Sequence, residues 1–263
     1  MAQTSLRRAH LVLGGFPVGS PALHDMDYAR LQLLGVTGSM ENVYTTLSGD
    51  YADIEKWLSD CQLLITYTAG PYPSEEQTQW LRGWIEAGGR WFGLHGSSGG
   101  RAAPVPGKRQ RQMVKLPYHD LLGGFFLNHP PLRDFRVDVA DTAHPLMKGV
   151  PTSFETRDEP YMLEIQHPED THVLLTAELG PDLTPERGFY VEKDTALLPD
   201  GKTRVLGYSR QIGRGTIVYY ALGHNTTQAQ WPSMPGVFRG SWEKPAFQTM
   251  VRNAIEWGLS PQE

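Results

Sequence analysis

The chain has 263 residues, a formal net charge of −5, 40% hydrophobic residues and 20% charged residues. This composition is that of an ordinary globular protein, and the length suffices to bury a large core. Nucleic-acid binding relies on clustered Lys and Arg that contact phosphates, so the negative net charge argues against that class of protein.

Compartment and membrane contact follow from the cysteine count and the apolar runs. The single cysteine, Cys61, excludes an internal disulfide. No segment approaches the roughly 20 apolar residues of a membrane-spanning helix. The N-terminal MAQTSLRRAHLVLGGF lacks the long apolar region of a signal peptide. We therefore expect a cytoplasmic protein without a membrane partner, and the sequence leaves open whether it is a monomer or a homo-oligomer.

The first hundred residues alternate between strand-like and helix-like segments. Apolar and β-branched runs predict strands, and helical spacing predicts helices: strands at 10–16, 42–49, 61–70 and 90–96, helices at 21–36, 51–60 and 74–89. Ser74 is placed to cap the last of these helices. The alternation is typical of a parallel sheet with helices on both faces, in which ligands bind beyond the carboxyl ends of the strands.

The second half of the chain is richer in strand-like segments. Residues 101–117 hold five basic residues, three prolines and no acidic residue, which predicts a loop, either solvated or closing over the carboxyl-end rim as a flap. A hairpin with the turn QIGRG and a C-terminal amphipathic helix at 244–259 follow. We predict a single α/β domain over residues 1–263, with a mostly parallel sheet that the β-rich second half extends.

Several of the nine histidines follow strands or glycine turns, and three stand out by context: His95, His129 and His224. Imidazoles that converge with a carboxylate suit zinc or another divalent metal, and Asp158 and Glu159 are the carboxylate candidates. A lone histidine is more often a core or surface residue, and the acidic pair is equally compatible with a solvated turn. Since no short metal-binding motif is present, these ligands would come from distant positions.

The segment GLHGSSGG at 93–100 also has the outline of a nucleophile elbow. In a Gly-x-Ser-x-Gly elbow the serine would occupy position 95, where this chain has a histidine. Ser97 or Ser98 would then act as the nucleophile, with His129 or His224 as the base. Glycines at such a corner also leave backbone N–H groups free to bind an anion.

Five segments, in this order and spacing over residues 90–259, resemble the ThuA-like family of trehalose-utilisation proteins: GLHGSSGG, YHDLLGGFFLNHP, DTAHPLMKGVPTSFETRDEPY, GRGTIVYYALGHN and FQTMVRNAIEWGL. The resemblance implies a flavodoxin-like α/β fold related to class I glutamine amidotransferases. It also implies a role in carbohydrate catabolism, particularly with 3-keto disaccharides and glucosides. His95 stands about where the amidotransferases carry a cysteine, so amidotransferase chemistry is not expected.

The positions that match the family are His95, His129, Glu159 and His224. The more trehalose-linked members read Gly-His-Glu at the last of these positions, where this chain has Asn225. This departure favours a divergent member of the family with a substrate of its own.

We therefore expect a metal-dependent enzyme that acts on a sugar or keto-sugar by isomerisation, elimination or hydrolysis. His95, His129, His224 and Glu159 are the expected ligands of a divalent ion, zinc or manganese. The expected catalytic residues are His95, Glu159 and Asp158, because a metal that polarises a carbonyl makes the adjacent C–H acidic and leaves a base to move the proton.

The small-molecule sugar is expected to contact Ser97, Tyr161 and Asn225. Two other functions remain compatible with the sequence. One is a serine-dependent hydrolase that uses Ser97 or Ser98. The other is a non-catalytic sugar-binding or partner module on an amidotransferase-like scaffold, since a fold does not by itself imply a function.

Overall fold

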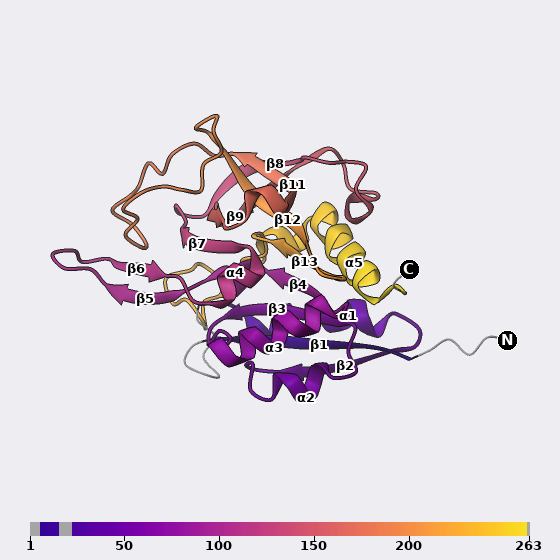
Figure 1. The fold of residues 1–263 in the computed structure, drawn as a ribbon. Helices are drawn as coiled ribbons and strands as arrows, with labels where there is room; N and C mark the ends of the chain where they lie inside the picture. Colours follow the sequence, from indigo (N-terminus) through magenta and orange to yellow (C-terminus); the bar gives the residue numbers. More distant parts are fainter. Residues whose placement is uncertain (1–5, 16–22, 262–263) are drawn as a thin grey trace.

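Figure 1 shows the computed structural model, which describes residues 6–15 and 23–261. The last residue of the strand predicted at 10–16 and the first two of the helix predicted at 21–36 lie outside these ranges. None of the helices in the described ranges combines the length and the hydropathy that crossing a bilayer requires.

Nine of the described strands form one sheet in the order β2-β1-β3-β4-β13-β12-β11-β8-β9. Their bounds are β1 Arg7–Gly15, β2 Val43–Ser48, β3 Leu63–Ala69, β4 Arg90–Leu94, β8 Arg133–Val139, β9 Ser153–Asp158, β11 Thr171–Glu178, β12 Thr203–Ile212 and β13 Gly215–Tyr220. The sheet therefore runs through both halves of the chain. Each strand expected in the first hundred residues is present, shifted by a few residues at its ends.

The prediction of a mostly parallel sheet is wrong, because the described sheet is mixed. The pairings among β2, β1, β3, β4 and β13 are parallel. The pairings from β13 through β12, β11 and β8 to β9 are antiparallel. For β12 and β13 the physical reason is connection length: a tight turn at Gly213 joins them, and only antiparallel neighbours accept so short a link.

Helices pack on this sheet in two groups: α1 Met26–Gly38 contacts α5 Pro245–Leu259, and α3 Glu75–Glu86 contacts α2 Ile54–Leu58 and α4 Tyr118–Leu122. Ser74 caps α3 as predicted. Its hydroxyl accepts the Gln77 N–H, and the Gln77 side chain accepts the Ser74 N–H, which together form a capping box. Helix α5 buries the apolar stripe expected from the sequence, including Phe247, Met250 and Ile255.

Shorter elements surround the main sheet. Three two-stranded sheets pair β5 Arg101–Pro104 with β6 Arg111–Val114, β7 Gly124–Asn128 with β10 Met162–Ile165, and β14 Thr226–Thr227 with β15 Val237–Phe238. The described residues also form the 3-10 turns η1 His95–Ser98, η2 Pro145–Met147, η3 Pro168–Asp170 and η4 Gly240–Glu243.

The basic segment at 101–117, predicted as a loop, contains the β5–β6 hairpin. The hairpin extends away from the main sheet in Figure 1. Its prolines do not prevent pairing, because Pro104 stands at the end of its strand, where a missing N–H is tolerated. The Tyr190 N–H donates to the Arg111 carbonyl, so the chain near residue 190 supports the hairpin. Composition alone does not reveal such pairing.

The elbow after β4 keeps the strained geometry expected of a nucleophile turn. His95 has φ +48°, which is costly for a residue with a side chain. Gly96 is required next to it, since a Cβ there would lie 2.5 Å from the Thr68 carbonyl oxygen of β3. The Tyr219 hydroxyl donates to the His95 carbonyl at 2.6 Å and holds the turn in place.

His119 supports the same elbow from α4. Its Nε2 lies 2.9 Å from the Gly99 carbonyl, and its Nδ1 lies 2.8 Å from the Leu116 N–H. Nε2 therefore donates, while Nδ1 also lies 3.0 Å from the Leu116 carbonyl, so backbone groups hold both ring nitrogens. Burial lowers the pKa of His119 to about 4, so the folded protein resists its protonation.

We expect His119 to weaken the fold in acid. The unfolded chain takes up this proton near pH 6.5 and the folded chain only near pH 4, so stability is lost as the pH falls between these values. The loss from this residue is about 2 kcal/mol between pH 7.5 and 5. Urea unfolding at both pH values should show a smaller pH difference for His119→Gln than for wild type. An identical difference would contradict the assignment, whatever the absolute stabilities.

Candidate metal centre

His95 lies at the centre of a buried polar cluster at the carboxyl ends of β4 and β13. Its Nδ1 lies 2.8 Å from the Ala221 carbonyl, so this nitrogen carries a proton and donates. Its Nε2 lies 3.1 Å from His24 Nε2 and 3.3 Å from Glu159 Oε2. An imidazole oriented by a carbonyl at one nitrogen presents the other to a ligand, as metal-binding histidines do.

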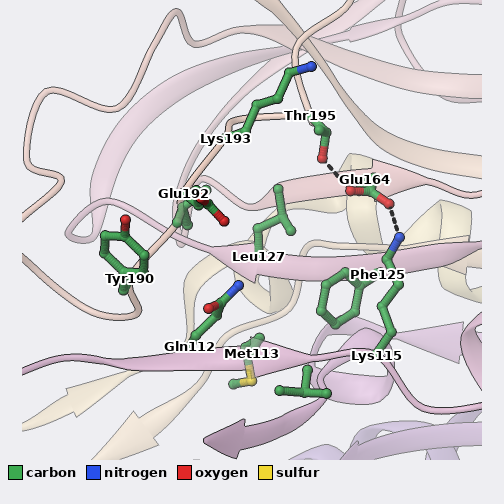
Figure 2. Close-up of a pocket in the computed structure, with 12 residues that line it drawn as sticks. Gln112, Met113, Lys115, Phe125, Leu127, Glu164, Tyr190, Glu192, Lys193 and Thr195 are labelled. Atoms are coloured by element: carbon green, nitrogen blue, oxygen red, sulfur yellow. Dashed lines mark hydrogen bonds and ion pairs between the residues drawn. The ribbon is translucent and has the colours of Figure 1, made fainter. Parts of the chain in front are cut away.

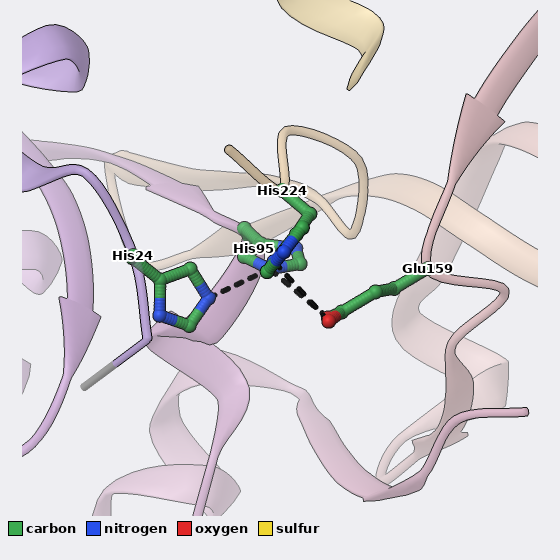
Figure 3. A group of neighbouring side chains, drawn as sticks. All are labelled: His24, His95, Glu159 and His224. Atoms are coloured by element: carbon green, nitrogen blue, oxygen red, sulfur yellow. Dashed lines mark hydrogen bonds and ion pairs between the residues drawn. The ribbon is translucent and has the colours of Figure 1, made fainter. Parts of the chain in front are cut away.

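Four side chains meet here: His24, His95, Glu159 and His224. One nitrogen or oxygen of each lies within 4.8 Å of those of the others. Figure 3 shows His24 and Glu159 approaching from opposite sides, with His95 and His224 between them. Ligands about 2.1 Å from a common tetrahedral ion are roughly 3.4 Å apart, close to the separations around His95 Nε2.

The His224 side chain gives the test of whether a cation fits. It is almost completely buried, and neither ring nitrogen makes a hydrogen bond within the described residues. Nδ1 lies 3.1 Å from Glu159 Oε1, close enough for an ion pair but without hydrogen-bond geometry. Since buried polar atoms almost always have partners, the His224 nitrogens fit a bound cation. The donor set of three imidazoles and one carboxylate fits zinc or manganese.

Charges within the cluster are strongly coupled. Burial acts to raise the pKa of Glu159, but the neighbouring His129, His224 and His95 outweigh it and hold this pKa well below its usual range. Burial acts to lower the pKa of His95, and contact with the Glu159 carboxylate reverses the effect and raises it. Glu159 is thus ionised, and its charge favours the protonated form of His95. A metal ion that bound His95 would displace this proton.

Asp158, predicted as a catalytic carboxylate, has an anchoring position in the structure. Its Oδ1 accepts the N–H groups of Glu159 at 2.8 Å and His224 at 3.1 Å. Its Oδ2 accepts the Gly223 N–H at 2.9 Å and the Ser241 hydroxyl at 2.5 Å. Because both oxygens already accept hydrogen bonds, Asp158 holds the Glu159 and His224 backbones in place.

The four clustered residues include His24 in place of His129, which the sequence predicted as a ligand. His129, predicted as a ligand, lies outside the group of four, with Nε2 3.4 Å from Glu159 Oε1 and Nδ1 bonded to the Pro130 carbonyl. His24, which the sequence reasoning did not select, takes the fourth place. A signal for it existed, since His24 precedes α1 and therefore belongs to the connection that leaves the carboxyl end of β1.

Tyr161, one of the three residues expected to contact substrate, lies at the cluster. Its hydroxyl is 3.3 Å from His95 Nε2, and its ring stacks on His95 with centroids 4.7 Å apart. Asn225 is buried near by, where its Nδ2 donates to the Tyr67 hydroxyl at 2.9 Å and its Oδ1 has no partner in the described chain. Tyr161 therefore contacts the cluster directly, and Asn225 contacts it through Tyr67, whose ring stacks on His95.

Ser97 and Ser98 are fully buried behind the elbow. The Ser97 hydroxyl accepts the Thr68 N–H at 3.4 Å, and the Ser98 hydroxyl bonds the Tyr219 hydroxyl at 2.7 Å. Within the described residues, neither hydroxyl makes a hydrogen bond to a histidine side chain. The contacts therefore indicate a supporting role for both serines and do not favour the serine-hydrolase interpretation.

A cavity of about 410 Å³ lies elsewhere, between β6, β7 and the chain around 190–195 (Figure 2). Glu164 bonds Lys115 and Thr195 there, as the dashed lines show. None of the four clustered residues lines this cavity. Glu164 is paired with Lys115 and Thr195, and no histidine lines the cavity, so it lacks the convergent imidazoles of the histidine cluster.

Comparison with known proteins gives the family. The model of the ThuA family, described as trehalose utilisation, matches residues 23–258. The chain belongs to the ThuA family. All four clustered residues of this ThuA-family chain lie inside the matched range. No curated protein sequence matches the chain.

Solved structures share the fold at low sequence identity. A ThuA-like protein from Bacteroides uniformis has a TM-score of 0.65 at 15% identity, covering 100% of this chain and 95% of its own. A ThuA-like protein from Parabacteroides merdae has a TM-score of 0.60 at 18% identity, covering 97% and 90%. A β-galactosidase from Rahnella sp. R3 matches 97% of this chain over 32% of its own, with a TM-score of 0.54 at 13% identity. The ThuA fold thus also occurs as one part of a larger protein.

Proposed function

We propose that this ThuA-family protein is a divalent-metal-dependent enzyme that acts on a sugar or keto-sugar. The observation that carries the proposal is the convergence of three imidazoles, those of His24, His95 and His224, with the Glu159 carboxylate. The buried ring nitrogens of His224 make no hydrogen bond within the described residues. The family description, trehalose utilisation, supports a carbohydrate substrate. Asn225, at the position where trehalose-linked members carry a glutamate, favours a substrate other than trehalose itself.

His24, His95, His224 and Glu159 are the residues that would hold zinc or manganese. A bound divalent ion would polarise a sugar carbonyl and make the adjacent C–H more acidic. Glu159 is suited to be a ligand rather than a base, because its pKa lies well below the usual range and it holds a proton weakly.

His129 is the residue that we assign to proton transfer. Its side chain is 29% exposed, whereas the side chains of His95 and His224 are buried, so it reaches both the centre and solvent. An imidazole can both accept and donate a proton in catalysis. His129 would remove a proton from the carbon next to the carbonyl and leave the electron pair of the C–H bond behind. In isomerisation the proton returns at the neighbouring carbon. In elimination the electron pair expels a β-substituent.

Tyr161 positions the reacting oxygen. Burial, and then the charge of Glu159, hold the pKa of Tyr161 well above its usual range, so its hydroxyl stays protonated. A protonated hydroxyl beside His95 Nε2 donates a hydrogen bond to a sugar oxygen that enters the centre.

Metal analysis of the purified protein tests the proposal together with a proton-exchange assay. We expect about one zinc or manganese ion per chain in wild type and almost none in His95→Ala or His224→Ala. A 3-keto-glucoside in D₂O should gain deuterium next to its carbonyl, or lose its β-substituent, only with the metal-loaded protein. His172→Ala, at a side chain 52% exposed, is the matched control and should behave as wild type.

Two outcomes would overturn this function. Absence of stoichiometric metal, with unchanged activity in both histidine variants, would remove the metal centre. Tight sugar binding by the metal-loaded protein without exchange or turnover would instead indicate a sugar-binding module.

A further inference from the structure

One segment of the chain begins at His224 and contacts the residues next to His24 and Glu159. We call residues 224–241 the clasp: it begins at His224, forms the β14–β15 hairpin and ends at the start of η4. A Cβ on Gly240 would lie 2.6 Å from the His224 carbonyl oxygen, so the end of the clasp returns to its beginning. Gly240 has φ +50°, a second reason for glycine at this position.

Near its end the clasp holds the residue that follows His24. Arg239 Nη1 lies 2.7 Å from Asp25 Oδ2, with both side chains largely buried, at 16% and 13% exposure. The Arg239 guanidinium also stacks on the Tyr28 ring, 3.9 Å from its centroid. A largely buried ion pair with a stacked guanidinium has one well-defined geometry, unlike a surface pair.

The beginning of the clasp holds Asp25 as well. The Asp25 N–H donates to the Asn225 carbonyl at 3.0 Å, while its Oδ1 caps α1 by accepting the Tyr28 N–H at 3.1 Å. Asp25 is therefore fixed to the clasp at two points, one on either side of the hairpin.

The backbone before His24 needs such restraint. Leu23 has φ +68°, in the left-handed region that disfavours residues with a side chain, and the residue is 52% exposed. A conformation of this kind persists where surrounding contacts impose it. The contacts that Asp25 makes with the clasp supply that restraint.

The end of the clasp also reaches the acidic pair. The Ser241 hydroxyl donates to Asp158, whose carboxylate in turn accepts the N–H groups of Glu159 and His224. The clasp thus connects the backbones that carry His24, Glu159 and His224.

We propose that Arg239 is a positioning residue of the metal centre, which through Asp25 fixes the His24 imidazole against His95. The inference rests on the proposed function, since it assigns a metal to the four clustered residues. Arg239 touches none of the reacting groups. Its loss lets Leu23 relax to an unstrained conformation and moves the His24 nitrogen away from the other ligands.

Zinc affinity and the cobalt absorption spectrum of the full chain test this role. By competition with a chromophoric chelator, Arg239→Ala should bind Zn²⁺ 10- to 100-fold more weakly than wild type. Loss of the positive charge of Arg239 removes its repulsion of the cation and would by itself strengthen Zn²⁺ binding. A weaker affinity therefore reports a change in the geometry of the ligands. The visible spectrum of the Co²⁺-loaded variant should change with the ligand geometry, and Arg239→Lys should recover part of the affinity.

Two further variants complete the experiment. Asp25→Asn keeps the helix cap but removes the charge that Arg239 binds. Since loss of a negative charge weakens cation binding by itself, the Co²⁺ spectrum is the readout for this variant, and it should change as in Arg239→Ala. Arg82→Ala breaks an exposed ion pair of 2.6 Å with Asp120, which is not one of the clustered residues, and should match wild type. Wild-type affinity and spectrum in Arg239→Ala, with a wild-type spectrum in Asp25→Asn, would overturn the positioning role alone. Failure of wild type itself to bind Zn²⁺ would overturn the metal centre and the role of Arg239 together.

Discussion

Replacing His24 with alanine should lower the Zn²⁺ affinity at least about 100-fold, beyond the 10- to 100-fold typical of groups that only support a ligand. His24 Nε2 lies 3.1 Å from His95 Nε2 and belongs to the group of four. His129 lies outside that group and, of its four members, contacts the ligand Glu159, so His129→Ala should cost about 10-fold in affinity, the lower end of the range for supporting groups. Chelator competition on both variants measures the difference.

The same two variants separate binding from proton transfer. His129→Ala should retain its metal but lose exchange of the keto-sugar C–H, whereas His24→Ala should lose both. If His129→Ala proved metal-free and His24→Ala fully loaded, the ligand set would be the one predicted from the sequence, and our assignment of His24 would be wrong.

Asp158→Asn should lower the free energy of unfolding by about 3–5 kcal/mol, as expected when several buried charge-assisted hydrogen bonds are lost. Asp158 is fully buried, and its oxygens accept N–H groups from Glu159, Gly223 and His224 as well as the Ser241 hydroxyl. An asparagine amide would direct an NH₂ group at some of these donors. Urea unfolding at pH 7.5 measures the effect.

Asp134→Asn provides the control for Asp158. Asp134 pairs with Arg157 at 3.0 Å on an exposed surface, so its replacement should change stability by less than about 1 kcal/mol. An equally small effect at Asp158 would show that it does not anchor the loops, and would restore it as a candidate catalytic group.

Local sequence patterns predicted most of the elements that surround the site. The Ser74 cap, the apolar stripe of α5 and the β12–β13 hairpin all depend on residues close together in the chain. Such features are set by hydrogen bonding and burial over a few turns, so local reasoning reaches them. The β5–β6 hairpin was missed because its proline-rich composition hides the pairing of Arg101 with Val114.

The candidate site was predicted in part. His95 and His224 follow apolar strands that end at the same edge of the sheet, so their convergence with Glu159 followed from strand order and family resemblance. His24 was missed because it precedes a helix, and a lone histidine there has no local pattern that marks a ligand. The choice between Asp158 and Glu159 was also open, because adjacent carboxylates look equivalent in sequence.

The sequence by itself determined the ThuA family, the elbow at His95 and the kinds of side chain that reach the rim. Only the tertiary structure decided which of these side chains meet. Backbone donors from Gly223 and His224 engage Asp158 and leave Glu159 to face the histidines, and Arg239 holds Asp25 beside His24 across more than two hundred residues of chain. Such contacts join segments distant in sequence, and their geometry depends on how strands and loops pack, which no local pattern records.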